Sequence, residues 1–199
     1  AAAAGAGRPG NILLPMSTIG SFPKSDRLKQ ARADHARGAL GRAALRAIEE
    51  EETVACLRLQ ERLGLDVLVD GEMYRGDMAT YFAENLEGFG ISGLVRSYGN
   101  RYYRKPVVTG KVRWTRPVTV EWFTFAQRQT PKPVKAILTG PYTMMDWSFD
   151  ETYGSRETLA LALAEAVREE AAALVAAGAR YVQIDEPAIS VRPEEIGLA

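Results

Sequence analysis

Four short runs of apolar and β-branched residues, each ending in a turn signal, constrain the fold of this 199-residue chain most strongly. They occupy residues 17–22, 65–72, 134–141 and 179–187. Runs of this length that end at Gly or Pro are typical of buried strands. Helical patterns lie between the runs, and this alternation of strand and helix favours a parallel α/β fold.

Two of the helical patterns are especially clear. Residues 155–178 carry Leu and Val at helical spacing, with Ser155 placed to cap the start and Gly178 placed to end the helix. Residues 49–64 carry acidic side chains in the first turn, an apolar stripe and Gly64 at the end. Both segments are therefore predicted to be amphipathic helices that cover a sheet.

The strand ends help to choose between two parallel architectures, a doubly wound sheet and a (β/α)8 barrel. No glycine-rich phosphate motif follows any of the four runs, which weakens the nucleotide-binding form of the doubly wound sheet. Polar side chains follow three of the runs instead: Ser21, Glu72 and Asp185. Barrel enzymes carry their chemistry at this end of the strands. Residues 94–114, rich in Tyr, Val and Arg, predict a β-hairpin inserted as a lid or binding loop.

Composition excludes several classes of function. Lys plus Arg and Asp plus Glu are balanced at 25 each, so no basic surface for nucleic acid or membrane is expected, and the predicted ligand is small. The single cysteine excludes an internal disulfide framework and favours the cytoplasm, and no run is long enough to span a membrane. Residues 1–11 are predicted to be a disordered leader or linker before a domain at 12–199.

Several carboxylates are candidates for a binding site. Asp185 and Glu186 end a predicted buried strand, so they need a cationic or hydrogen-bonding partner, and a functional role is favoured. Glu72 follows a strand and a glycine, and a helix cap or surface turn is an equally good interpretation. Residues 17–23 combine a hydroxyl, a glycine and backbone N–H groups, which suits binding of a carboxylate.

Other candidates have strong structural alternatives. Trp147 can stack on a flat heteroaromatic ligand, although packing in the core is the commoner role. Arg101 and Tyr102 can clamp a ligand or form a solvated hairpin face. His35 and Cys56 are predicted to be structural, because a zinc site normally takes three or four ligands.

Six motifs carry a family resemblance when they are taken in order: "TIGSFP", "ERLGLDVLVDGE" with "DMATYF", "SYGNRY", "PVTVEWFTFAQ", "KPVKAILTGPYTMMDWSF" and "AGARYVQIDEPAI". Together they resemble the catalytic domain of cobalamin-independent methionine synthase, in its core-type form. The resemblance implies a (β/α)8 barrel that transfers a methyl group from 5-methyltetrahydrofolate polyglutamate to homocysteine. The family uses zinc to hold the homocysteine sulfur as a thiolate.

The resemblance also implies roles for individual residues. The carboxylate of the amino acid would be held by Ile19, Gly20 and Ser21. Its ammonium group would be bound by Glu72 and Asp185. Those that contact the folate would be Arg101, Tyr102 and Trp147. Tyr102 differs from the cysteine of the enterobacterial form, and Val191 stands where longer enzymes have a folate-contacting acidic residue. Because some core-type relatives are thought to use a corrinoid donor, the methyl donor stays open.

In the family, the zinc ligands and the proton-donating histidine lie beyond the "IDEPA" strand, which here means beyond Ala199. The chain is therefore expected to hold four of the eight strands, the first half of the barrel. Its partner would be the other half-barrel or a second copy, because unpaired strand edges favour association. The alternatives are a non-catalytic half-barrel that binds amino acid or pterin, and a relative of uroporphyrinogen decarboxylase. The second suits the pair Glu72 and Asp185 less well, since porphyrin substrates are acidic.

Overall fold

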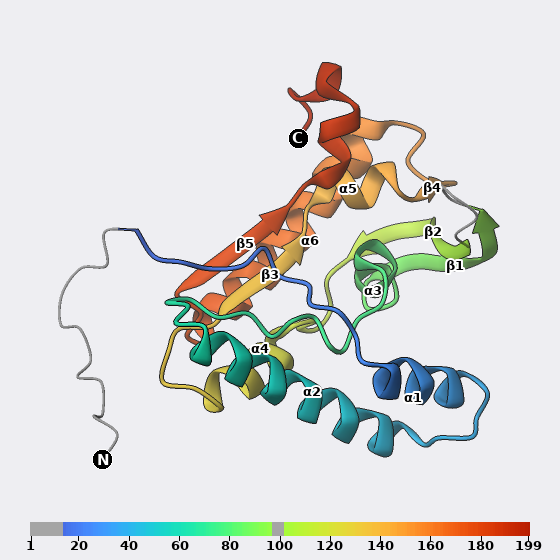
Figure 1. Cartoon of the computed structure of the whole chain (residues 1–199). Helices are drawn as coiled ribbons and strands as arrows, with labels where there is room; N and C mark the ends of the chain where they lie inside the picture. The colour runs from blue at the N-terminus through green and yellow to red at the C-terminus, as the bar shows by residue number, and fades with distance from the viewer. Residues whose placement is uncertain (1–13, 97–101) are drawn as a thin grey trace, which may run out of the picture.

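The computed structural model describes residues 14–96 and 102–199 and has an α/β organisation (Figure 1). The predicted leader, residues 1–11, lies outside this part of the chain. The helices are α1 (Asp26–Ala36), α2 (Arg42–Arg62), α3 (Met78–Ala83), α4 (Val120–Arg128), α5 (Pro141–Asp146) and α6 (Arg156–Ala176), followed by the short 3-10 turns η2 (Pro187–Val191) and η3 (Pro193–Glu195). The strands are β1 (Glu87–Arg96), β2 (Tyr102–Arg113), β3 (Lys135–Thr139), β4 (Phe149–Asp150) and β5 (Tyr181–Asp185).

The central pair of strands, β3 and β5, is parallel, with α6 as the crossover helix between them (Figure 1). Its register runs from Lys135 opposite Tyr181 to Thr139 opposite Asp185. The predicted strands at 134–141 and 179–187 are thus confirmed as a parallel pair. One expectation about β5 is wrong: it is not fully buried, since Tyr181 and Ile184 are 42% and 50% exposed.

The predicted strand at 65–72 forms only in part. Leu68 makes a single parallel bridge with Val134, through hydrogen bonds from Leu68 N to Pro133 O and from Lys135 N to Leu68 O. The residues after the bridge turn at once, because Gly71 takes the left-handed backbone at φ 73°. The segment therefore extends the β3–β5 pair by one bridge and then leaves it.

The predicted strand at 17–22 is wrong, because no ladder forms there among the described residues. Its carbonyl groups bind side chains instead of a neighbouring backbone. Lys135 Nζ donates to Thr18 O at 2.8 Å, and Gln183 Nε2 donates to Ile19 O at 2.7 Å. The extended segment is thus held against β3 and β5 by side chains, which no sequence pattern within 17–22 could reveal.

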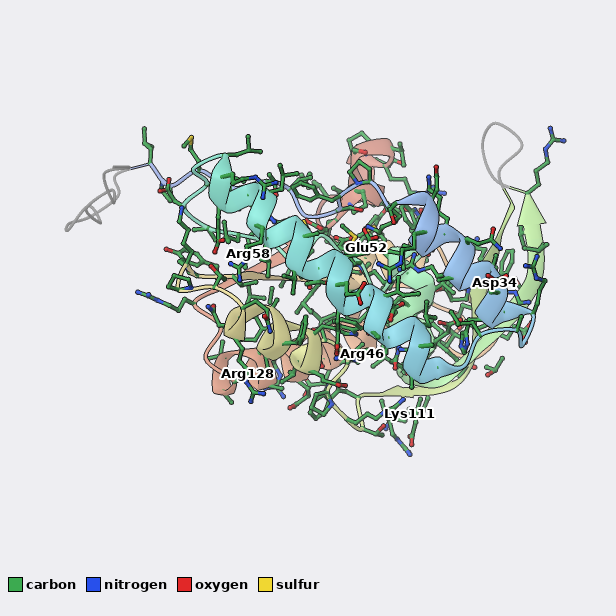
Figure 2. All side chains as sticks on the ribbon, turned by 60° about the horizontal axis from the view of Figure 1, so that its bottom comes forward. Asp34, Arg46, Glu52, Arg58, Lys111 and Arg128 are labelled. Atoms are coloured by element: carbon green, nitrogen blue, oxygen red, sulfur yellow. The ribbon has the colours of Figure 1, made fainter. Side chains whose placement is uncertain are left out.

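Both predicted helices are confirmed. In α6, the Ser155 hydroxyl accepts a hydrogen bond from Thr158 N, and Gly178 follows the helix with φ 97°. Helix α2 begins earlier than predicted, at Arg42, because Leu45 on its first turn is buried against α1. Arg46 of α2 lies over the Trp122 ring of α4, 3.6 Å from the ring centre, and Figure 2 shows these two helices side by side.

The predicted hairpin is confirmed as β1 paired antiparallel with β2, and it begins at Glu87 rather than at residue 94. Its first strand contains three glycines, which hid it from the sequence pattern. Gly88 has φ 89°, and a Cβ there would lie 2.6 Å from the Lys111 carbonyl oxygen, so this position requires glycine. The turn around Gly99 lies outside the described residues, and Gly110 lies within β2.

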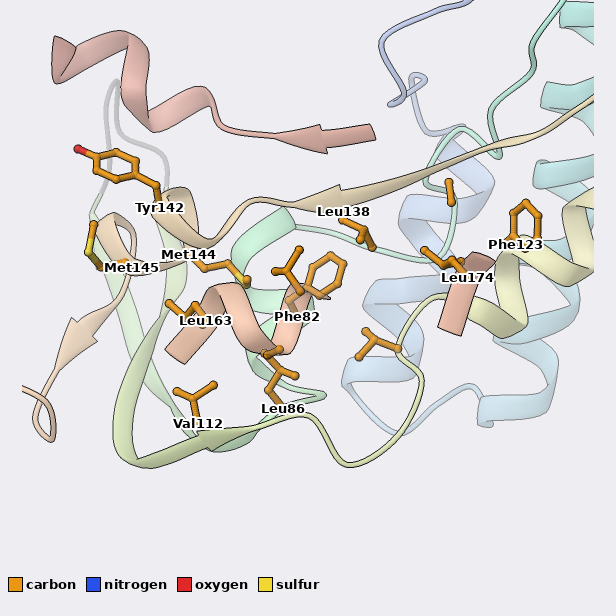
Figure 3. Packing of buried hydrophobic residues seen from close by; sticks show 14 of the residues in the cluster. Phe82, Leu86, Val112, Phe123, Leu138, Tyr142, Met144, Met145, Leu163 and Leu174 are labelled. Carbon is orange, nitrogen blue, oxygen red and sulfur yellow. The ribbon is translucent and has the colours of Figure 1, made fainter. Parts of the chain in front are cut away.

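The main core lies between α6, the β3–β5 pair, α3, α5 and the hairpin. Figure 3 shows Phe82, Leu138 and Leu163 converging there. One buried carboxylate joins these layers: Glu170 of α6, 1% exposed, accepts hydrogen bonds from the segment that follows the hairpin. The donors are Trp114 Nε1, Val118 N, Thr119 N and Thr119 Oγ1, at 2.7–2.8 Å. Glu170 thereby fixes where the hairpin leaves the core. Among the described residues, no helix is both long and apolar enough to cross a membrane.

Candidate functional site

A pocket of about 410 Å³ opens at the carboxyl end of β5. Its lining comes from three separate segments of the chain: Ile19, Ser21, Glu72, Arg75, Met78, Asp185, Glu186 and Pro187. Four of the five residues predicted to bind an amino acid are in this set. The pocket therefore brings together side chains that lie far apart in the sequence.

Gly20, the fifth of these residues, lies directly against the pocket's acidic wall. Its φ is 154°, and a Cβ there would overlap Ile137 Cδ1 and lie 3.0 Å from Glu72 Oε1. A larger residue at this position would push the loop away from Glu72. Glycine therefore allows the hydroxyl side of the pocket to approach the carboxylate side.

Glu72 sits in a tight turn and has an unusual backbone. Its φ is 57°, and it is the one non-glycine residue with positive φ in the described part of the chain. The Asp70 carboxylate holds the turn, since Asp70 Oδ1 accepts a hydrogen bond from Glu72 N at 2.8 Å. Burial raises the pKa of the Asp70 carboxyl, and the hydrogen bond from Glu72 N and the charge of Arg75 oppose this shift. Left-handed backbone at a non-glycine residue costs free energy and is often found at functional sites.

Arg75 is a pocket residue that the sequence analysis missed. Its Nη2 donates to Glu72 Oε1 at 2.6 Å, and the two side chains are 1% and 12% exposed. A basic residue three positions after an acidic one is common on any surface, so the spacing alone gave no signal. Burial at the pocket wall distinguishes this pair from an ordinary surface ion pair.

Asp185 and Glu186 are adjacent in the sequence but have different surroundings. Asp185 lines the pocket, and its Oδ1 accepts a hydrogen bond from the neutral Gln183 side chain at 2.7 Å. Glu186 points its carboxylate at the start of α5, where it accepts from Tyr142 N at 2.9 Å and Thr143 N at 2.7 Å. Glu186 is thus engaged in holding α5, while Asp185 keeps an oxygen available to a ligand.

Lys24 is a second residue that the sequence analysis missed. Its ammonium donates to Phe22 O and Gly71 O, both at 2.8 Å, and to the Ser21 hydroxyl at 3.3 Å. Burial lowers the pKa of Lys24, while the nearby charge of Glu72 opposes that shift. Because lysine only donates, the Ser21 hydroxyl keeps its own proton for another acceptor. Ser21 is therefore set up to donate to an anion.

The pocket thus has a hydroxyl donor with a cation behind it on one side and two carboxylates on the other.

Comparison with known proteins agrees with the family that the sequence motifs resemble. The family model described as the catalytic domain of cobalamin-independent synthase matches residues 14–193. The chain belongs to this family.

Curated relatives in the cobalamin-independent synthase family are identical to this chain at nearly half of the aligned positions. The 5-methyltetrahydropteroyltriglutamate–homocysteine methyltransferase of Synechococcus sp. (strain JA-2-3B'a(2-13)) is 49% identical over 178 residues, which is 88% of this chain and 24% of the relative. The enzyme of the same name from Mesorhizobium japonicum is 46% identical over 177 residues, 88% of this chain and 23% of the relative. The chain therefore spans about a quarter of the length of these relatives.

A solved structure from the same family supports the fold. The B12-independent methionine synthase of Shewanella sp. W3-18-1, in complex with selenomethionine, matches with a TM-score of 0.78 and 32% identity. The match covers 92% of this chain and 55% of the Shewanella chain. The α/β architecture of the methionine synthase family is thus present in most of this chain.

Of the three residues predicted to contact folate, the structure describes the side chain of Trp147, and it does not line the pocket. Trp147 follows α5, is partly buried and packs against the main core, which agrees with its alternative structural interpretation. Arg101 lies outside the described residues, and Tyr102 begins β2 with its side chain not described. Val191, at the end of η2, is 70% exposed. The folate roles of Arg101, Tyr102 and Trp147 therefore stay predictions.

His35 and Cys56 lie in structural surroundings, as predicted. His35 Nδ1 is 2.8 Å from the Leu40 carbonyl oxygen, and Cys56 is buried beneath Gly71, where burial raises the thiol pKa to about 12. Within the described residues, no group of three or more His, Cys, Asp or Glu side chains is arranged to hold a metal ion. The described residues therefore do not provide a set of ligands that fits the zinc of the methionine synthase family.

Proposed function

We propose that this chain provides the amino-acid pocket of an enzyme that transfers a methyl group to homocysteine to give L-methionine. The observation that carries the proposal is the meeting of Ser21, Glu72 and Asp185 at one pocket. The names of the curated relatives support homocysteine as the acceptor and a methyltetrahydropteroyl-glutamate as the donor.

The pocket's chemistry suits the two charged groups of an α-amino acid. The ammonium group is a cation with three donors, and Glu72 and Asp185 offer carboxylate oxygens to it. The α-carboxylate accepts hydrogen bonds, and the Ser21 hydroxyl, oriented by Lys24, offers a donor together with the backbone of residues 19–21. Homocysteine and methionine share these groups, so either can occupy the pocket in the same orientation.

We also propose that the described fold is the first half of a (β/α)8 barrel. Strands β3 and β5 pair in parallel, segment 65–72 adds one bridge to them, and the match covers 55% of the Shewanella enzyme. Strand β5 pairs with β3, and the partly exposed Tyr181 and Ile184 lie along it. A further strand, from the remaining half-barrel or from a second copy of this chain, would pair with the edge of β5 that no described strand occupies.

The described residues say less about the methyl donor and the metal than about the amino-acid pocket. We assign no step to zinc, because the described residues do not fit such a site. In the family, the metal would hold the homocysteine sulfur as a thiolate. Folate is the proposed donor, and a methylcorrinoid is the alternative. Methionine formation assayed with each donor in turn would distinguish them.

Binding of L-methionine tests the proposed pocket directly. Asp185→Asn removes the negative charge but keeps the shape, and we expect it to weaken binding by about 2–5 kcal/mol, the usual cost of breaking a desolvated charge pair. Isothermal titration calorimetry measures the loss. Asp26→Asn is the matched control, because the Asp26 side chain is fully exposed on α1. Equal affinities for the Asp185 variant and the wild type would remove Asp185 from the site.

A further inference from the structure

The role of Glu72 depends on a neighbour that carries no assigned function. Arg75 reaches Glu72 within a single turn of the chain, and its Nη2 lies 2.6 Å from Glu72 Oε1. The guanidinium also lies over the Phe82 ring, 6.0 Å from the ring centre. Arg75 is thus enclosed between the pocket wall and the apolar core.

The burial of Arg75 is costly and incompletely compensated. Its Nε and Nη1 are buried with no hydrogen-bond partner, so only Nη2 makes a described bond. Each unpaired buried donor costs free energy, and more so in a charged group. An arginine kept only for stability would have its donors satisfied or exposed. The single bond that Arg75 does make is directed at a pocket carboxylate.

Glu72 needs such a partner because its backbone is strained. A left-handed glutamate persists only when its surroundings hold it. Asp70 Oδ1 holds the Glu72 N–H, and Arg75 N donates to Glu72 O at 3.3 Å. Together, the Asp70 and Arg75 contacts fix both the backbone and the carboxylate of Glu72.

The ion pair also changes the charge that a ligand meets. Glu72 is already paired with a cation, and Glu186 is occupied by the N–H groups of α5. The hydrogen bond to Asp185 comes from the neutral Gln183 amide. Lys135 lies close enough for its charge to act on Asp185, but its ammonium donates to Thr18 O and Gln183 Oε1. The wall therefore presents one carboxylate without a directly bonded cation, Asp185, and one positioned carboxylate, Glu72.

We propose that Arg75 is a positioning residue that holds Glu72 in its strained conformation and offsets its charge, so that Asp185 is the main counterion of the substrate ammonium group. The second part of this inference rests on the proposed function, because it names an ammonium ligand. The first part concerns only how Glu72 is held. Because Arg75 offsets the charge of Glu72, the pocket wall balances one positive charge, that of the ammonium group of an α-amino acid.

A binding cycle tests this coupling. L-Methionine affinity is measured by calorimetry for the wild type, Arg75→Met, Glu72→Gln and the double variant. We expect each single variant to bind at least tenfold more weakly, and the double variant to lie within twofold of the weaker single, because both changes remove the same positioned oxygen. Wild-type affinity in Arg75→Met, or losses that multiply in the double variant, would overturn the proposal.

Two further variants guard the interpretation. Arg168→Met breaks an Arg–Glu pair of the same spacing and the same 2.6 Å distance, but on an exposed face of α6, and should bind like the wild type. Arg75→Lys keeps a cation without the guanidinium fork and replaces Arg75→Met if that variant does not fold. It should bind at least threefold more weakly than the wild type, and equal binding would overturn the positioning role.

A crystal structure separates this inference from the proposed function. If the wild-type chain does not bind methionine, the proposed function fails, and the positioning role is judged without a ligand. In the crystal structure of Arg75→Met, or of Arg75→Lys, Glu72 should leave φ near 57° and turn its carboxylate away from the pocket. An unchanged Glu72 in that structure would overturn the positioning role.

Discussion

Gly140 leaves the space that the Glu186 carboxyl group occupies, because a Cβ at residue 140 would overlap that group. The carboxylate reaches the N–H groups of Tyr142 and Thr143 through this space. Gly140 N also donates to Asp185 O at 2.8 Å. The end of β3, the start of α5 and the end of β5 are therefore locked together beside the pocket, and Asp185 is placed by the same contacts.

Gly140→Ala should destabilise the chain by about 1–3 kcal/mol, the usual cost of overpacking, because the new methyl group displaces the Glu186 carboxylate. Urea unfolding measures the free energy. Gly41→Ala is the control: Gly41 precedes α2 with almost the same backbone angles as Gly140, and a Cβ there meets nothing within 4 Å. Equal losses in the two variants would show that the Glu186 contact adds nothing.

Glu170→Ala should cost roughly 3 kcal/mol or more in the free energy of unfolding. It leaves the N–H groups of Val118 and Thr119 buried without an acceptor, and each such donor costs about 1–3 kcal/mol. The partly buried Trp114 also loses its acceptor. Glu169→Ala removes a neighbouring carboxylate that is 40% exposed and should change stability little. A Glu170 loss no larger than the Glu169 loss would contradict this role.

Asp70→Asn should alter the pH dependence of stability. Burial raises the pKa of Asp70 above its ordinary 3.8, so the folded chain retains a proton that the unfolded chain has lost. The contribution of Asp70 to stability therefore falls as the pH rises above about 3.8. Asn stays neutral and still accepts from Glu72 N, so the stability of the variant relative to the wild type should increase with pH. The free energy of unfolding of both proteins is measured at several pH values. A difference between them that is the same at every pH would rule this prediction out.

Lys24→Met should weaken L-methionine binding about tenfold, or about 1.4 kcal/mol, because it removes the ammonium group that orients the Ser21 hydroxyl. Binding of L-methioninol, which lacks the carboxylate, should change little. Comparing the two ligands by calorimetry isolates the carboxylate contact. Lys29→Met, on an exposed face of α1, serves as the control. Equal losses for both ligands would indicate a general loss of structure.

The features that local patterns encode were predicted correctly. Strands β3 and β5, helices α2 and α6 and the second strand of the hairpin each carry their pattern within their own residues, whereas three glycines hid the first strand of the hairpin. The pocket carboxylates Glu72 and Asp185 were found because polar residues at strand ends converge in parallel α/β folds.

The features that depend on distant partners were not predicted. Segment 17–22 has a strand-like sequence, but its carbonyl groups bind side chains of Lys135 and Gln183. Glu186 resembles Asp185 in sequence, and only the position of α5 separates their roles. Arg75 is significant because it is buried, which no spacing of charges predicts.

The attachment of segment 17–22 has a consequence for how this pocket can change over evolution. The backbone hydrogen bonds of a β-sheet form with almost any side chain. A segment held by such bonds therefore moves only when the sheet itself changes. Here two replaceable side chains, Lys135 and Gln183, hold the carbonyl groups of residues 18 and 19. Substitutions at Lys135 or Gln183 could therefore shift the side of the pocket proposed to bind the carboxylate while the parallel strand pair stays intact. Ligand preference and fold could then evolve separately.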